Sequence, residues 1–416
     1  MGFTDAIRKL QGHHGDPLDS TQRGQRRRLI LQDTVALLSL LGITIVLFII
    51  TFFSFSSFRT HRQVLENRWF ARGQQALASG NAPYAVEAFR SALTLSSGNR
   101  TYEIALARAL AASGRTDEAF AYYSTLRDAT PGDGLLNLQL ARLSVKKNEP
   151  AQAIAFYRNA LNGDWKTEGV ARRRVARLEL AQYLLSQHQP LQAQEELLTA
   201  GGNALENPPV MNRIAGLLEQ SNDLPDALTA YQRAQKYAKS NSPEMLQALL
   251  GENRVAESLG DYHAAAVALE RYLARAHPAH RPAPEVSVAE ASLDRLQRME
   301  ALNPLPSLPP RERAKRLLAN GSIAHKRFTA CMAQTHNQAQ MSNQNPNDLA
   351  AFATLAPRWQ SFSTLRLWKV SNNQQLQDSL ASLINQTEIL THRACGAPAG
   401  DDALLLQLAV VPNRTE

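Results

Sequence analysis

The pattern of hydrophobic and polar residues changes sharply at residue 58. From Thr34 to Phe58 the chain carries no charged side chain over 25 residues, which is long enough to cross the hydrocarbon core of a bilayer as a helix. A buried helix of a soluble protein would show a polar stripe, and a cleavable signal peptide would have a shorter apolar run followed by small residues. The pattern therefore predicts a transmembrane helix over 34–58 that acts as an uncleaved signal anchor.

Basic residues flank both ends of this span. Arg26, Arg27 and Arg28 form a tight cluster on the N-terminal side, whereas the arginines beyond Phe58 are similar in number but more widely spaced. Cytoplasmic flanks of membrane helices carry an excess of Lys and Arg. Together with the short N-terminal tail, the cluster leads us to expect the N-terminus in the cytoplasm. The rest of the chain would lie on the non-cytoplasmic side, which is the periplasm in a bacterium.

Beyond the span, small and aromatic residues recur at a spacing of about 34 residues, interrupted by two short insertions. An alanine marks each unit, an aromatic residue or leucine follows it by four positions, and a residue suited to a turn precedes it by five. The alanines are Ala85, Ala119, Ala153, Ala193, Ala227 and Ala265; the residues that follow are Phe89, Tyr123, Tyr157, Leu197, Tyr231 and Leu269; the turn residues are Gly80, Gly114, Asn148, His188, Asn222 and Gly260. This pattern predicts two antiparallel helices per unit, with a left-handed turn and the alanine where the second helix passes close to the first.

These units resemble the tetratricopeptide repeat (TPR), a helix-turn-helix unit of 34 residues. In the first unit, Trp69, Gly73 and Leu77 match the family pattern as well. The resemblance covers roughly residues 66–278, although the fourth unit is degenerate and the closing proline is clear only at Pro131. It implies an all-α fold with an α-solenoid of about six repeats, which binds proteins or peptides and performs no catalysis.

The chain after the repeats is also expected to be helical. An amphipathic segment at 285–301 would cap the last repeat, and the proline-rich stretch Asn303–Pro310 predicts a semi-rigid linker. Two further helices are expected at Arg311–Met341 and Asn373–Cys395, with the sequence around Pro357 between them. The predicted domains are a basic polar tail at 1–33, the transmembrane helix at 34–58, the TPR solenoid with its cap at 59–302, the linker at 303–310 and a small helical C-terminal domain with its tail at 311–416.

Two short features of the C-terminal region add detail to this picture. The apolar run Ala403–Val411 is too short to span a membrane and predicts either a strand or a peptide that docks back onto the array. The two cysteines of the chain, Cys331 and Cys395, would lie on the two expected helices. Isolated thiols in a reducing compartment are usually inert core residues, but outside the cytosol a disulfide is favoured. Because we place this region outside, we expect a bond between them.

Composition and charge exclude several classes of function. The net charge of +8 is spread thinly, with +2 in residues 1–33, +2 in 34–302 and +4 in 303–416. No domain therefore has the concentrated basic face that nucleic-acid binding requires. The sequence also lacks a CxxC pair and the HExxH, P-loop, GxGxxG and GxSxG motifs. We expect no catalytic residue, no bound metal and no cofactor, and a protein that is not an enzyme.

Partner binding is the expected function, and it would use the groove lined by the first helices of the repeats. Arg108 and Arg142 take the same first-helix position in consecutive units, and Arg254 takes it in the sixth. Arginines stacked in this way can clamp the carboxylates of an acidic peptide. The alternative is a set of solvated charges on a polar surface.

Arg172, Arg173 and Arg174, beside the insertion near residue 166, form a second candidate partner surface, with a solvent-facing helix edge as the alternative. Two hypotheses then stay open for the protein as a whole. It is a membrane-anchored scaffold or chaperone-like adaptor that binds proteins through its repeats, or it is a structural component of a cell-wall or secretion complex that docks through residues 311–416. Neither hypothesis fixes an oligomeric state.

Overall fold

The computed structural model describes residues 20–202, 206–276, 283–339 and 346–410. Within these ranges the chain is all-α, and it divides inside one helix into two compact units, Met1–Phe156 and Tyr157–Glu416. The predicted all-α fold, with a solenoid of paired helices, is confirmed. The N-terminal part of the predicted polar tail and Val411 lie outside the described residues.

Helix α2 (Ser20–Ala78) is a continuous helix of 59 residues that contains the whole predicted span. Its apolar side chains are exposed along the span, as in Leu37 at 68% and Phe48 at 70%. Four hydroxyls of this segment, those of Thr34, Ser39, Thr44 and Thr51, donate to carbonyls of the preceding turn, for example Thr44 Oγ1 to Leu41 O at 2.8 Å, so they need no water. Among the described helices, α2 is the one long and apolar enough to cross a membrane, a property it shares with signal sequences.

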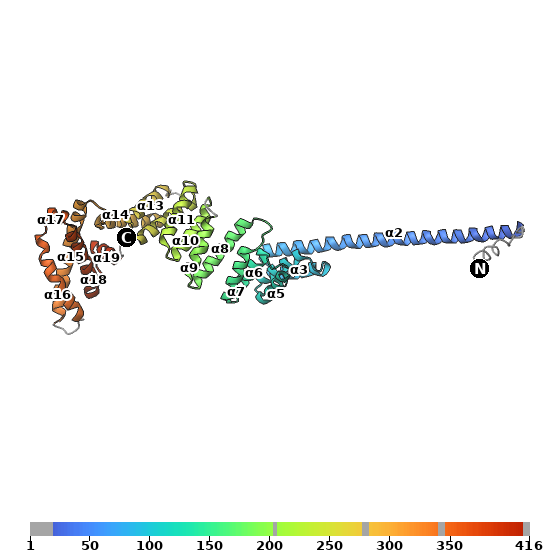
Figure 1. The fold of residues 1–416 in the computed structure, drawn as a ribbon, viewed down its shortest axis with the longest axis horizontal. Coiled ribbons are helices and arrows are strands. Elements are labelled where there is room, and N and C mark those ends of the chain that lie inside the picture. The colour runs from blue at the N-terminus through green and yellow to red at the C-terminus, as the bar shows by residue number, and fades with distance from the viewer. Residues whose placement is uncertain (1–19, 203–205, 277–282, 340–345, 411–416) are drawn as a thin grey trace, which may run out of the picture. The chain divides into compact units, whose positions relative to one another are not determined.

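The helices that follow are short, antiparallel and packed in successive pairs (Figure 1). The pairs are the end of α2 with α3 (Ala82–Leu95), α4 (Arg100–Ala112) with α5 (Thr116–Ala129), α8 (Gly169–Ser186) with α9 (Pro190–Gly202), α10 (Pro208–Gln220) with α11 (Leu224–Tyr237) and α12 (Pro243–Leu259) with α13 (Tyr262–Arg275). Between α5 and α8 lie α6 (Gly134–Lys146) and α7 (Pro150–Asn162), joined by the same kind of turn. The boundary between the two compact units falls within α7.

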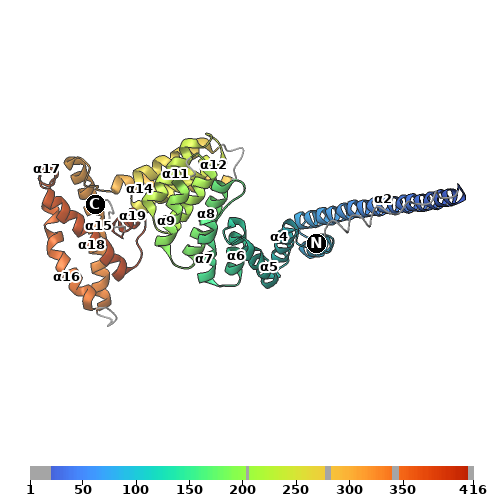
Figure 2. The ribbon, with the colours of Figure 1, turned by 45° about the vertical axis from the view of Figure 1, so that its right-hand side comes forward.

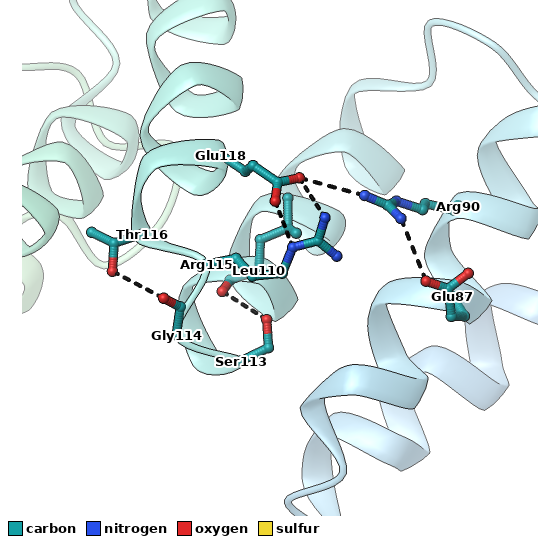
Figure 3. A network of polar contacts seen from close by, with 8 residues as sticks. All are labelled: Glu87, Arg90, Leu110, Ser113, Gly114, Arg115, Thr116 and Glu118. Atoms are coloured by element: carbon teal, nitrogen blue, oxygen red, sulfur yellow. Dashed lines mark hydrogen bonds and ion pairs between the residues drawn. The ribbon is translucent and has the colours of Figure 1, made fainter.

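All six predicted turn residues close their turns in one way. Each has left-handed backbone, with φ between 58° and 80°, and these residues are Gly80, Gly114, Asn148, His188, Asn222 and Gly260. The next residue donates its N–H to the carbonyl five positions back, for example Arg115 N to Leu110 O at 3.0 Å. This Schellman arrangement satisfies a carbonyl that the end of the helix leaves without a partner. Figure 3 shows the turn at Gly114 with its neighbours Ser113 and Thr116.

The six repeat alanines are all fully buried, at 0% exposure. In the first unit, Ala85, Ala119 and the rings of Phe89 and Tyr123 belong to one continuous apolar cluster. The same close packing explains Gly73, because a Cβ added there would lie 2.5 Å from the ring of Phe89. The predicted register of the repeats is therefore the register of the packed helices.

Ion pairs run across the outer helices of the first repeats (Figure 3). Arg115 Nε lies 2.6 Å from Glu118 Oε1, and Arg90 contacts Glu118 at 3.5 Å and Glu87 at 3.4 Å. These side chains are well exposed to solvent, so each pair is worth at most about 1 kcal/mol. Apolar packing, rather than these charges, sets the spacing of the repeats.

The C-terminal region continues the helical packing. Helix α14 (Ala283–Leu302) packs on α13 through Leu296 and Met299, as predicted for a capping helix. Its neighbours in sequence are α15 (Pro310–Ala339), α16 (Pro346–Gln360), the 3₁₀ turn η2 (Phe362–Thr364), α17 (Leu367–Ser371), α18 (Gln374–Cys395) and α19 (Asp401–Val410). Helices α15, α16 and α18 pack together (Figure 2). The rings of Phe328, Phe352 and Trp359 belong to the apolar cluster that these helices form.

A disulfide joins Cys331 on α15 to Cys395 at the end of α18, with 5.9 Å between their Cα atoms, which confirms the predicted bond. Three other features differ from the expectations. The interval around Pro357 is itself largely helical, because α16 runs through this proline to Gln360 and gives up the one backbone hydrogen bond that a proline cannot donate. The Ala403–Val410 run is a helix rather than a strand, and it packs on α14 at the end of the array, in agreement with the docking alternative. The proline-rich linker packs against α15, since Arg316 donates to the carbonyl of Asn303 at 2.9 Å.

The alanine register can be tested with one pair of substitutions on α5. Ala119 is buried and Ala121 is exposed on the same helix. We expect Ala119→Leu to lower the free energy of unfolding by about 1–3 kcal/mol, because the added atoms overpack the contact with the first helix. Ala121→Leu should leave it nearly unchanged. Chemical denaturation of the full-length protein in detergent measures both, and equal midpoints for the two variants would show that the register is wrong.

Candidate functional site

The predicted first-helix arginines Arg108 and Arg142 converge on one buried hydroxyl. Arg108 lies on α4 and is exposed, Arg142 lies on α6 and is half-buried, and Tyr123 on α5 lies between their helices in sequence. Burial raises the pKa of Tyr123 to about 12, while the positive charges of Arg108 and Arg142 act in the opposite direction. Both guanidinium groups are therefore close to this hydroxyl. We call these three residues the Tyr123 cluster.

In the Tyr123 cluster, the buried hydroxyl of Tyr123 lies near two positively charged side chains. The Tyr123 side chain is 1% exposed, and its hydroxyl makes no well-aligned hydrogen bond within the described structure, although Arg108 lies near enough to favour its ionised form. No carboxylate is among the groups that shift the pKa of Tyr123. A buried hydroxyl normally has a partner, and the side chains that act on this one are Arg108 and Arg142. Arg142 also has an interaction within the structure, whereas Arg108 is exposed to solvent.

Tyrosine and arginine also lie together in the second compact unit, Tyr157–Glu416, and there a glutamate joins them. Tyr231 on α11 donates its hydroxyl to Glu219 Oε2 at 3.0 Å. Arg254 on α12 holds the same carboxylate with both arms of its guanidinium, at 3.1 Å and 3.0 Å, and contacts the tyrosine hydroxyl at 3.3 Å. Burial and Glu219 raise the pKa of Tyr231 to about 12. We call these three residues the Tyr231 cluster.

The Tyr231 ring fits its place because Gly251 has no side chain. A Cβ added at Gly251 would lie 2.2 Å from the ring, so the helix bearing Arg254 can pack directly on Tyr231. The third repeat tyrosine, Tyr157, also faces a carboxylate, with its hydroxyl 3.5 Å from Glu179 Oε2. Arg254 is thus committed to a partner within the chain, and Tyr123 is the repeat tyrosine without a carboxylate partner in the described structure.

The second predicted surface, Arg172 to Arg174, is mostly occupied with the chain itself. Arg173 donates to the carbonyls of Leu161 at 3.1 Å and Gly163 at 2.8 Å, and so caps the C-terminal end of α7. Arg172 lies 3.8 Å from Glu168 one turn away, and Arg174 also has an interaction within the structure. These contacts fit a helix edge that fastens the insertion between α7 and α8.

The sequence pattern identified the arginines but not the groups that surround them. Tyr123 and Tyr231 stood out only as core positions of the repeat, and Glu219 did not stand out at all. One signal was present: the position four residues after the repeat alanine is Tyr in three units but Phe or Leu in the others. A hydroxyl at a core position needs a partner, so this difference pointed to polar chemistry there. Within the described residues, no three His, Cys, Asp or Glu side chains gather to hold a metal ion.

No family model matches the sequence, and no curated protein matches it. Several solved TPR structures are similar at low identity. PilF from Pseudomonas aeruginosa is 18% identical, with 56% of this chain and 99% of that chain covered and a TM-score of 0.39. YrrB, a TPR protein with an unusual peptide-binding site, is 15% identical, with 50% and 100% covered and a TM-score of 0.37.

The C-terminal part of a TPR protein from Cytophaga hutchinsonii is 14% identical to this chain. The likeness covers 66% of this chain and 96% of that chain, with a TM-score of 0.41. These TM-scores are all below 0.5, so the assignment of this chain to the helical-repeat class stands on its own helix pairs, turns and buried alanines.

Proposed function

We propose that this protein is a non-enzymatic, membrane-anchored adaptor that holds an acidic segment of a partner protein at the Tyr123 cluster. The observation that carries the proposal is the Tyr231 cluster, where tyrosine and arginine on successive helices hold the carboxylate of Glu219. The Tyr123 cluster also brings tyrosine and arginine together, and no carboxylate is among the groups that shift the pKa of Tyr123. Arg142 has an interaction within the structure, so the exposed Arg108 is the arginine that would hold a carboxylate of another protein.

The physical argument rests on charge and geometry together. An arginine holds a carboxylate through two parallel hydrogen bonds, which fix the orientation of the ligand. Arg108 is exposed, so a ligand can reach it without unfolding the repeat. Tyr123, whose hydroxyl feels the charge of Arg108, would orient the Arg108 guanidinium. The fitting partner is a peptide rich in Asp and Glu, or a free C-terminus.

Membrane anchoring completes the proposed role. The uncharged span of α2 continues as one helix into the first repeat, so the adaptor would be held close to the bilayer surface. The disulfide between Cys331 and Cys395 favours an oxidising compartment for the repeats and the C-terminal helices. We therefore place the repeats in the periplasm or an equivalent non-cytoplasmic space, where the protein would serve envelope assembly, secretion or chaperoning.

A second candidate function is a structural component that docks through the C-terminal region. One observation favours it: Trp368 on α17 is 70% exposed and stands between Arg366 and Lys369. Exposed tryptophan beside basic residues is common at the centres of protein interfaces. Deletion of 311–416 would abolish partner capture under this candidate, whereas loss of the repeats would abolish it under the adaptor proposal.

The adaptor proposal predicts a specific loss of affinity in Arg108→Gln. With the full-length protein in detergent, we expect fluorescence anisotropy to show binding of an oligo-glutamate peptide and about a tenfold weaker Kd for the variant, because a charge-assisted hydrogen bond is lost. The control is Arg90→Gln, a half-buried arginine on α3 that pairs with Glu87 and Glu118, and this variant should bind like the wild type. The melting temperature of both variants should stay unchanged. Equal binding of an oligo-glutamine peptide would contradict the proposal.

The proposed topology predicts a one-sided protection pattern. In spheroplasts, added protease should degrade residues 60–416 and leave an N-terminal tag intact, because the Arg26–Arg28 cluster is expected to stay in the cytoplasm. Immunoblots against the tag and the C-terminus give the answer, with detergent-lysed cells as the control. Protection of the repeats in intact spheroplasts would reverse the topology.

A further inference from the structure

Two carboxylates, one buried and one half-buried, lie near each other where α19 packs on α18. Glu388 on α18 is 0% exposed, and neither of its carboxylate oxygens has a hydrogen-bond partner within the described structure. The Oδ1 atom of Asp402, in the first turn of α19, is also buried without a partner. Buried carboxylates are normally paired or well hydrogen-bonded, so this pair has a cost that the fold itself does not explain.

The connection between α18 and α19 lets α19 move as a rigid helix. It follows the disulfide at Cys395 through a short connection in which Gly396 and Gly400 have positive φ, at 85° and 61°. It packs against α14, α15 and α18, with Leu404 and Leu405 buried, while Val410 at its far end is 61% exposed. The disulfide between Cys331 and Cys395 holds α15 and α18 together whether or not α19 is docked.

The charges that face the two carboxylates come from α15 and from α19 itself. Arg327 acts on both carboxylates and Lys326 acts on Asp402, while Asp401 adds a further negative charge. Arg327 is fastened elsewhere, because its Nε donates to Thr391 Oγ1 at 2.9 Å and its Nη2 donates to the carbonyl of Gly396 at 2.8 Å.

On the α14 side, the charged residue that lines the adjoining groove is Arg295, which donates to Glu257 at 2.6 Å. The two nearby cations of α15 disfavour a divalent metal between the carboxylates. A proton is the ligand that fits, since it removes the charge without adding a new one.

We propose that α19 is a proton-controlled latch: it stays docked while Glu388 and Asp402 hold protons, and it is released when both carboxylates ionise. Release would uncover the apolar surface of α14 that Leu404 covers, including Leu296 and Met299. The latch would therefore couple the acidity of the compartment to the exposure of an apolar face at the end of the array.

The electrostatics support the latch and give its direction. Burial, and then the charge of Asp402, raise the pKa of Glu388 from 4.5 to about 7, and burial also raises the pKa of Asp402. A carboxyl whose pKa is raised in the docked state stabilises docking fully below its ordinary pKa, and the contribution is lost as pH rises through the raised value. For Glu388 the interval from 4.5 to about 7 corresponds to a change of about 300-fold in the docking equilibrium.

Hydrogen–deuterium exchange of the full-length protein in detergent tests the latch. After correction for the intrinsic pH dependence of exchange, we expect the protection of the 401–410 amides to fall about 100-fold between about pH 5 and about pH 8. The α5 amides should show no such change. In Glu388→Gln, which cannot ionise, the fall should shrink to the part that Asp402 contributes, whereas the exposed control Glu290→Gln should behave like the wild type.

Asp402→Asn provides a second variant at the edge of the same contact, in case the change at Glu388 disturbs the core. It should also flatten the pH profile of α19. Protection of 401–410 that is independent of pH in the wild-type protein would overturn the latch. So would a pH profile that stays unchanged in both Glu388→Gln and Asp402→Asn when the two variants fold normally.

Discussion

The close approach of two antiparallel helices at a buried alanine is the contact on which the rest of this structure depends. A larger side chain at Ala119 or its equivalents would push the second helix away from the first. With the distance fixed, the turn has room for only one left-handed residue, and the same cap forms six times. The ring or leucine one helical turn further on then fills the remaining space. Packing sets the repeat, and surface ion pairs add little to it.

This framework also decides where polar chemistry can arise. The residue four positions after the alanine lies in the core, but a tyrosine there carries its hydroxyl toward the first helices of its own and the next repeat. At Tyr231 the neighbouring helices supply Glu219 and Arg254, and the charges satisfy one another. At Tyr123 the neighbours supply Arg108 and Arg142. The same position of the repeat thus places one tyrosine hydroxyl beside an arginine–glutamate pair and the other beside two arginines, of which Arg108 is exposed.

Features that depend on neighbouring residues could be predicted from the sequence. The alanines, the left-handed turns and the stapled cysteines follow from spacing and from the limited backbone freedom of most residues. Contacts between residues far apart in the sequence could not be predicted. The pairing of Glu219 with Arg254, for example, depends on how successive repeats stack. The burial of Glu388 was hidden for a similar reason: one acidic residue in an amphipathic helix ordinarily faces solvent. Here it is buried in the packing of α18, near Asp402 of α19 and Arg327 of α15, and no sequence pattern specified these neighbours.

The central claim is that the first-helix side of the repeats captures an acidic segment of a partner through Arg108. Site-specific photocrosslinking in intact membranes tests it most directly, with the photoreactive residue at the exposed position 112, one turn after Arg108 on α4, or at the exposed position 125 on α5. We expect a discrete adduct from position 112 that disappears in Arg108→Gln and none from position 125. The same adducts from both positions, or an adduct at 112 that survives Arg108→Gln, would contradict the account.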